Sequence, residues 1–139
     1  MAELRSAIVL IAGVLVSYAA VARDLAPLVE HENVPVVTGS GKAASTEAVG
    51  VAISNAAASG KRVWQVKHSA AGRLRASYDM RQYAISVDID YSAQAYSIRY
   101  AASENMRASE VNGQKVIHPF YNNWVDELKR GINAELGKL

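Results

Sequence analysis

The stretch "YAISVDIDY", residues 83–91, decides the fold of this chain, because large apolar residues alternate along it with small or acidic ones. A period of two is typical of a β-strand that buries one side and exposes the other. The isoleucines and the valine fall on one side, and Asp88 and Asp90 fall on the other. We therefore predict a strand of an antiparallel sheet whose two faces differ in character.

The stretches before and after this strand alternate in the same way. "VWQVKHS" and "RLRASYD" precede it and "YSIRY" follows it, with short breaks at residues 70–72, 80–82 and 92–95. We predict three tight hairpins in the following registers: Ser69 opposite Arg73, Tyr78 opposite Tyr83, and Tyr91 opposite Tyr96. All three registers place the apolar side chains on one face, and a slip of one residue would scatter them. The sequence therefore predicts a four-stranded antiparallel meander.

The two faces of this predicted sheet carry different side chains. The apolar face gathers Trp64, Val66, His68, Leu74, Ala76, Tyr78, Tyr83, Ile85, Val87, Ile89, Tyr91, Tyr96, Ile98 and Tyr100. The polar face gathers Gln65, Lys67, Arg73, Arg75, Ser77, Ser86, Asp88, Asp90, Ser97 and Arg99.

Charges on the polar face are predicted to be compensated at its centre and not at its edge. Asp88 lies opposite Arg99 in these registers and near Arg73, so an Arg–Asp–Arg row crosses three strands. Lys67 instead faces Arg75, and like charges directly opposite each other destabilise a sheet. An anionic partner outside the sheet would relieve this repulsion, and long cationic side chains extending into water would explain it equally well.

Two helices are predicted to flank the meander. The first runs from residue 45 or 46 to residue 59, with Ser45 as its N-cap and Gly60 as its stop. The second runs from about residue 119 to residue 136, and Pro119 suits its first position because no helical donor is lost there. Both are expected to cover the apolar sheet face. The predicted fold class is therefore a two-layer α+β domain of residues 45–139.

The N-terminus indicates the compartment. Residues 1–22 contain Arg5, an apolar run over residues 7–16 and a final Ala-Val-Ala, which is the layout of a secretory signal peptide cleaved after Ala22. The same residues are nearly long enough for an uncleaved membrane anchor, which stays open as an alternative. We expect a periplasmic or secreted protein, or alternatively one anchored to the inner membrane. Residues 23–44, with two prolines and a Gly-Ser-Gly, are predicted to be an extended linker.

Composition excludes several function classes. The net charge of +2, from 15 basic and 13 acidic residues, is too small to argue for nucleic-acid binding. The chain has no cysteine, so it can form no disulfide, thiol nucleophile or thiolate metal site. The "GSGK" at residues 39–42 lacks the first glycine of a phosphate loop and the hydroxyl residue after its lysine. We therefore expect no cofactor and no metal.

The ending "IHPFYNNWVDELKRGI", which starts at Ile117, resembles that of a known family, as do the preceding "YSIRYAASENM" and the signal-like N-terminus. The family consists of small uncharacterised proteobacterial envelope proteins, many of them classed as lipoproteins, that share an I-H-x-x-Y-N-x-W-V motif. His118 and Asn122 are the polar members of that motif in this chain. The chain departs from the family in lacking the lipidated cysteine. The resemblance implies an envelope location and no established activity.

The leading functional hypothesis is a non-catalytic binding or structural module of the cell envelope. It would contact a protein or an anionic envelope component through the open polar face and the loop at residues 101–118. The candidate binding residues are Lys67, Arg73, Arg75, Arg99, His118 and Asn122. The enzyme alternative requires His118 or His68 to approach Asp88 or Asp90, because no metal-binding histidine spacing and no nucleophile elbow are present.

Overall fold

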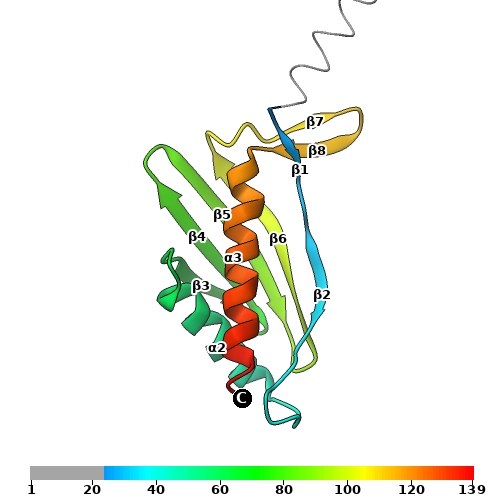
Figure 1. Cartoon of the computed structure of the whole chain (residues 1–139), viewed down its shortest axis with the longest axis vertical. Helices are drawn as coiled ribbons and strands as arrows, with labels where there is room; N and C mark the ends of the chain where they lie inside the picture. Colours follow the sequence, from blue (N-terminus) through cyan, green and yellow to red (C-terminus); the bar gives the residue numbers. More distant parts are fainter. Residues whose placement is uncertain (1–23) are drawn as a thin grey trace, which may run out of the picture.

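A computed structural model describes residues 24–139, and the predicted signal peptide or anchor at residues 1–22 lies outside this part. The described chain is an α+β structure with two helices and two antiparallel sheets (Figure 1). The larger sheet has five strands, in the order β2 (His31–Pro35), β6 (Ala95–Glu104), β5 (Tyr83–Tyr91), β4 (Arg73–Met80) and β3 (Gln65–Ala70). The smaller sheet has three strands, in the order β1 (Ala26–Pro27), β8 (Gln114–Ile117) and β7 (Ser109–Val111). The helices are α2 (Thr46–Ser59) and α3 (Pro119–Leu136), and neither is long and apolar enough to cross a membrane.

The predicted four-stranded meander is present as strands β3 to β6, and its third hairpin has the predicted register, with Tyr91 opposite Tyr96. The first hairpin keeps its register as far as His68 opposite Leu74, and then a bulge sets Ala70 opposite Arg73. The predicted pairing of Ser69 with Arg73 is wrong for that reason.

The predicted register of the second hairpin, with Tyr78 opposite Tyr83, is wrong by two residues. Met80 pairs with Tyr83 and Tyr78 pairs with Ile85, so the turn consists of Arg81 and Gln82 alone. Arg81 adopts a positive φ of 58°, which a two-residue hairpin turn requires. A shift of two residues leaves every side chain on its predicted face. The apolar face therefore survives the error, whereas the cross-strand partners change.

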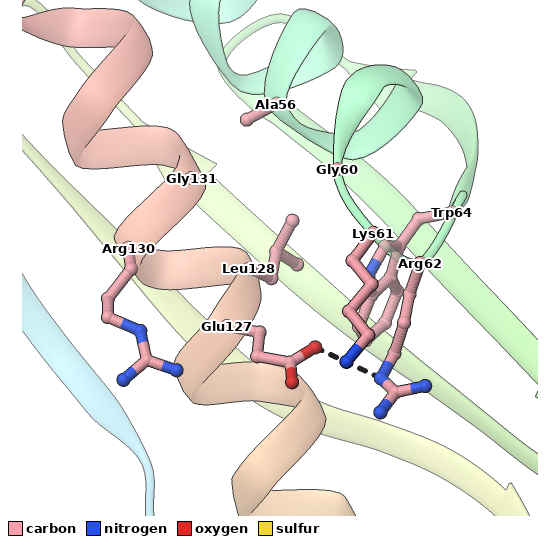
Figure 2. A pocket seen from close by; sticks show the side chains of 9 residues that line it. All are labelled: Ala56, Gly60, Lys61, Arg62, Trp64, Glu127, Leu128, Arg130 and Gly131. Carbon is pink, nitrogen blue, oxygen red and sulfur yellow. Dashed lines mark ion pairs between the residues drawn. The ribbon is translucent and has the colours of Figure 1, made fainter.

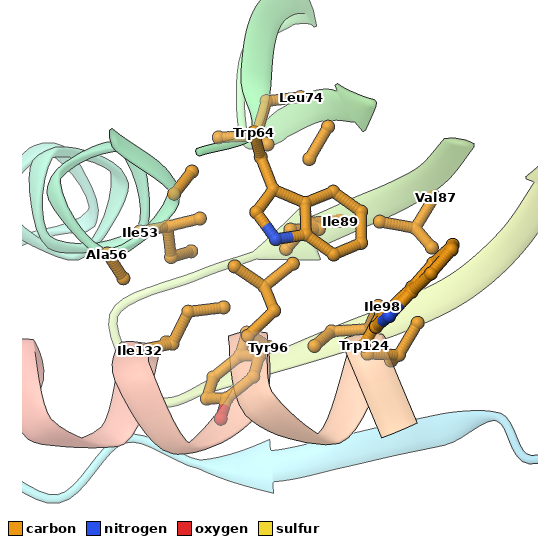
Figure 3. Packing of buried hydrophobic residues seen from close by; sticks show 14 of the residues in the cluster. Ile53, Ala56, Trp64, Leu74, Val87, Ile89, Tyr96, Ile98, Trp124 and Ile132 are labelled. Carbon is orange, nitrogen blue, oxygen red and sulfur yellow. The ribbon is translucent and has the colours of Figure 1, made fainter. Parts of the chain in front are cut away.

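Both helices cover the same face of the five-stranded sheet and close the core against it (Figure 1, Figure 3). Ile53 of α2, Ile132 of α3 and Ile89 of β5 are all fully buried in one cluster. Burying an aliphatic side chain of this kind contributes about 1.5–3 kcal/mol relative to leaving it exposed. Every residue predicted for the apolar face is buried or half-buried except His68, which is exposed on the edge strand β3.

Local signals position both helices where the sequence predicts them. The Ser45 hydroxyl accepts a hydrogen bond from the backbone N–H of Ala48 at 3.1 Å and so caps α2. Helix α3 begins with Pro119 at its first position and ends at Leu136, and its buried stripe includes Trp124.

The predicted linker at residues 23–44 is wrong in part, because strands β1 and β2 lie within it. Strand β2 pairs with β6 as the fifth strand of the larger sheet, and β1 pairs with β8. The sequence "HENVP" of β2 shows no clear alternation because this strand lies at the sheet edge and has a register shift within it. Residues 26–35 therefore belong to the domain that was expected to start at residue 45.

Candidate binding surface on the open sheet face

The open sheet face is the side of the five-stranded sheet that faces away from both helices. Its arginines come from the central strands, and their side chains are about half exposed: 53% for Arg73, 51% for Arg75 and 40% for Arg99. Strand alternation positions them there, because their neighbours Leu74, Ala76 and Ile98 point into the core.

Four charged side chains form a continuous row across this face, which we call the arginine–carboxylate row. Arg73 donates to both carboxylate oxygens of Asp90, at 2.5 and 3.1 Å. Arg99 donates to Asp90 at 2.5 Å and, through two nitrogens at 2.8 Å each, to both oxygens of Glu32. The row Glu32–Arg99–Asp90–Arg73 thus joins strands β2, β6, β5 and β4. Paired geometry of this kind fixes the guanidinium planes.

A separate bidentate pair joins Arg75 to Asp88, at 2.9 and 3.1 Å. The predicted row centred on Asp88 is therefore wrong, and Asp90 takes the central place. The cause is the register of the second hairpin, which sets Arg73 opposite Asp90 and Arg75 opposite Asp88. The Cα of Arg99 does lie opposite that of Asp88, as predicted, but its side chain reaches to Asp90 instead.

These contacts keep the groups of the row charged. The hydrogen bond from Arg73 is the main cause that holds the pKa of Asp90 below its usual value, and the bond from Arg99 adds to it. The hydrogen bond from Arg99 likewise lowers the pKa of Glu32, and the two carboxylates raise the pKa of Arg99. Asp90 is thus stabilised as a carboxylate and is not poised to donate a proton.

Lys67 is the one cation of the open face that forms no ion pair within residues 24–139. It lies opposite Arg75, as predicted. Four cations of the face (Lys67, Arg73, Arg75 and Arg99) are set against five carboxylates, because Asp79 and Glu104 flank Ala84 on the same side as Glu32, Asp88 and Asp90. The positive charge of the face is therefore local to the corner formed by Lys67 and Arg75.

A depression of ≈ 440 Å³ lies at the end of the row, where the turn after β3 meets the turn after β5. Arg73, Asp90 and Arg99 line one part of it, and Asn33 and Ser97 line another. The buried Ser97 hydroxyl accepts the backbone N–H of Asn33 at 3.0 Å. The polar groups that line the depression are therefore largely hydrogen-bonded or paired with one another.

His118 and Asn122, the other two candidate residues, lie at the start of α3 and make structural contacts. The Nδ1 of His118 accepts the backbone N–H of Phe120 at 3.1 Å, which makes this histidine the N-cap of the helix. Asn122 donates to the carbonyl of Pro27 at 2.8 Å and accepts the N–H of Val29 at 3.1 Å. The structure therefore gathers the four cationic candidates on the sheet and places these two in the helix layer.

The histidine–aspartate arrangement that the enzyme alternative required is not formed by the described residues. His68 pairs with Leu74 on the core side of β3, and His118 caps α3. Asp88 and Asp90 point to the opposite face of the sheet, where each binds arginine. Within residues 24–139, no three histidine or carboxylate side chains lie close enough together to hold a metal ion.

Sequence reasoning missed Glu32 of the row because it falls in the stretch predicted to be a linker. The only signal in the sequence is weak: Glu32 lies in a segment with Asn33 and Pro35 that is predicted to be extended, and such a carboxylate can pair with an arginine at the edge of a sheet. Only the pairing of β2 with β6 brings Glu32 to Arg99.

The fold and this surface define a small α+β protein with two helices, two antiparallel sheets and a polar sheet face that its helices leave open. Comparison of the chain with protein-family models, with curated proteins and with solved structures finds no match. The resemblance to envelope proteins thus stays a prediction from the sequence.

Proposed function

We propose that this chain is a non-catalytic binding module of the cell envelope, periplasmic or secreted, that contacts a protein through its open sheet face. The arginine–carboxylate row carries this proposal. The row and the separate Arg75–Asp88 pair hold three guanidinium groups in fixed orientations while leaving them about half exposed, so little side-chain entropy remains to be lost on binding. Membrane anchoring through residues 1–22 remains the alternative for its attachment to the envelope.

The balance of charges favours a protein over an anionic polymer as the partner. The open face as a whole has no surplus of positive charge, and each of its arginines already has a carboxylate partner, so its attraction to a polyanion is weak. A protein surface can match alternating charges one by one, which is how electrostatic complementarity gives specificity. The corner of Lys67 and Arg75 would receive an acidic group of that partner.

Lys67→Glu tests this proposal with little risk to the fold. The substitution replaces a like-charge pair with an opposite-charge pair beside Arg75, so we expect the free energy of unfolding to stay unchanged or to rise. A pull-down from envelope extract should then lose the partner that the wild-type chain retains. Lys42→Glu, which alters an exposed lysine of the loop before α2 by the same charge, is the matched control and should retain it.

Two results would argue against this surface. If Lys67→Glu and the double variant Lys67→Glu, Arg75→Glu retain every partner of the wild type, the open face is not the contact. If the variants lose only retention on a polyanionic resin, and no protein, the partner is an anionic polymer instead.

A further inference from the structure

A second candidate site lies in the helix layer, between the end of α2, the middle of α3 and the segment that leads into β3 (Figure 2). It is a pocket of ≈ 260 Å³, which we call the Trp64 pocket. Ala56, Trp64 and Leu128 supply its apolar lining, and the absence of side chains at Gly60 and Gly131 leaves it open. An apolar group can therefore enter between the two helices.

The cations around the Trp64 pocket outnumber the carboxylates that pair with them by one. Three cations, Lys61, Arg62 and Arg130, line it together with a single carboxylate, Glu127. Arg62 lies 3.0 Å from Glu127, and Arg130 pairs with Asp126 at 3.2 Å. Lys61 forms no ion pair with any residue of the described part of the chain. The rim therefore has a cation available for an anionic group next to the apolar lining.

Arg62 is held in position by aromatic rings and not by its carboxylate alone. Its guanidinium carbon lies 5.5 Å from the ring centre of Trp124 and 5.7 Å from that of Tyr78, within the range of cation–π contacts. Its Nε is buried and donates no directed hydrogen bond to a described residue, although the Glu127 oxygen is only 3.0 Å away. Its Nη1 donates to the Tyr78 hydroxyl at 3.4 Å, so Arg62 contributes a fixed positive charge beside the pocket.

From these observations we propose that the Trp64 pocket binds a peptide segment of a partner protein in which a large apolar side chain is adjacent to a carboxylate. The apolar side chain fills the space beside Trp64, and the carboxylate meets Lys61 and Arg62. The volume is slightly below the range of about 300–1,000 Å³ that small-molecule sites occupy, and it suits one anchoring side chain. Tryptophan, tyrosine and arginine are the residues that dominate such anchor sites in protein interfaces.

Two short peptides probe the proposed site directly. We would titrate the full chain with acetyl-Phe-Asp-amide and with its neutral isostere acetyl-Phe-Asn-amide, and follow the amide and indole N–H signals by NMR. The protein has two tryptophans, Trp64 in the pocket and Trp124 against Arg62, so both indole signals report on this region. We expect saturable shifts at Trp64 and Gly131, and affinity for the neutral peptide about threefold to tenfold weaker.

Charge variants supply the controls. Lys61→Glu should weaken binding of the acidic peptide by a similar factor of about threefold to tenfold, and Lys67→Glu on the opposite sheet face should leave it unchanged. Equal affinity for both peptides, shifts that do not involve Trp64 or Gly131, or no saturable shift at about 10 mM peptide would overturn the proposal. Binding of decanoate without binding of the acidic peptide would also overturn it, because the ligand would then be a free amphiphilic acid.

Discussion

Replacing glycine by alanine at two helical positions should change the stability in opposite directions, and the space around each glycine gives the reason. Gly50 lies within α2 and Gly131 within α3. Glycine in a helix interior is less favourable than alanine by about 0.8–1.0 kcal/mol, so Gly→Ala is stabilising wherever a methyl group fits. At Gly131 the added Cβ would lie 3.7 Å from the Cβ of Ala56, an ordinary contact. We expect Gly131→Ala to raise the free energy of unfolding by about 0.5–1 kcal/mol.

At Gly50 the same methyl group has no room. It would lie 2.7 Å from the hydroxyl oxygen of Tyr91 and 2.9 Å from two of its ring carbons. Overpacking of this kind costs about 1–3 kcal/mol, and subtracting about 1 kcal/mol of gained helix propensity leaves a net loss of about 0–2 kcal/mol. The two substitutions should therefore differ by about 1–3 kcal/mol, although each is Gly→Ala in a helix.

Urea unfolding followed by tryptophan fluorescence measures both effects. A double-mutant cycle with Tyr91→Ala isolates the clash: in that background Gly50→Ala should become stabilising by about 0.5–1 kcal/mol, because the obstructing ring is gone. The reasoning is refuted if Gly50→Ala is as stabilising as Gly131→Ala in the wild-type background, or if Tyr91→Ala does not change its sign.

Three further predictions concern hydrogen bonds and pH. Tyr96→Phe loses the 2.6 Å hydrogen bond to Asn133 and should lower the free energy of unfolding by about 0.5–1.5 kcal/mol. Tyr121→Phe removes a buried hydroxyl that no described residue binds, so it should leave the free energy of unfolding unchanged or raise it. Urea unfolding of both variants measures the difference. Burial above all lowers the pKa of His31 from 6.5, so near this pH the unfolded chain binds more protons than the folded chain. The free energy of unfolding should therefore fall as the pH drops below about 6.5. A His31→Gln variant whose free energy of unfolding falls equally steeply with pH would contradict this. Hydrogen bonds from Arg73 and Arg99 lower the pKa of Asp90 from 3.8, so Asp90→Asn should be less stable than the wild type at neutral pH. This difference in the free energy of unfolding should vanish as the pH falls through and below 3.8, because the wild-type carboxylate is then protonated. A difference that persists in acid would show that it has another origin.

The parts of the fold that local patterns determine could be predicted from the sequence. Alternation identified strands β3 to β6, and the Ser45 cap and Pro119 marked the helix starts within a residue. The register of the second hairpin could not be obtained this way, since registers that differ by two residues bury the same side chains. The ion partners on the open face depend on that register, so the error at one turn moved the centre of the row from Asp88 to Asp90.

Pairing between distant segments was the other part that the sequence did not determine. Strand β2 is short and lies at the edge of the sheet, so it buries too little surface to produce a clear pattern. Its place next to β6 follows from contacts that only the folded chain makes, such as Glu32 with Arg99 and Glu30 with the N–H of Tyr100. These contacts also complete the charge balance of the open face, which the sequence alone predicted to be more basic.

The ending that resembles envelope proteins can be explained by what the fold demands at the start of α3. Its aromatic and aliphatic members are buried, its histidine caps the helix, and its asparagine binds the backbone of the N-terminal segment at Pro27 and Val29. Each of the matching residues thus has a packing or hydrogen-bonding role: Ile117, His118, Tyr121, Asn122, Trp124 and Val125. A motif of this kind specifies how the last helix docks and how the first strands are attached to it. The motif is therefore accounted for by the structure of this chain, and function is left to the surfaces around it, which are the open sheet face and the Trp64 pocket.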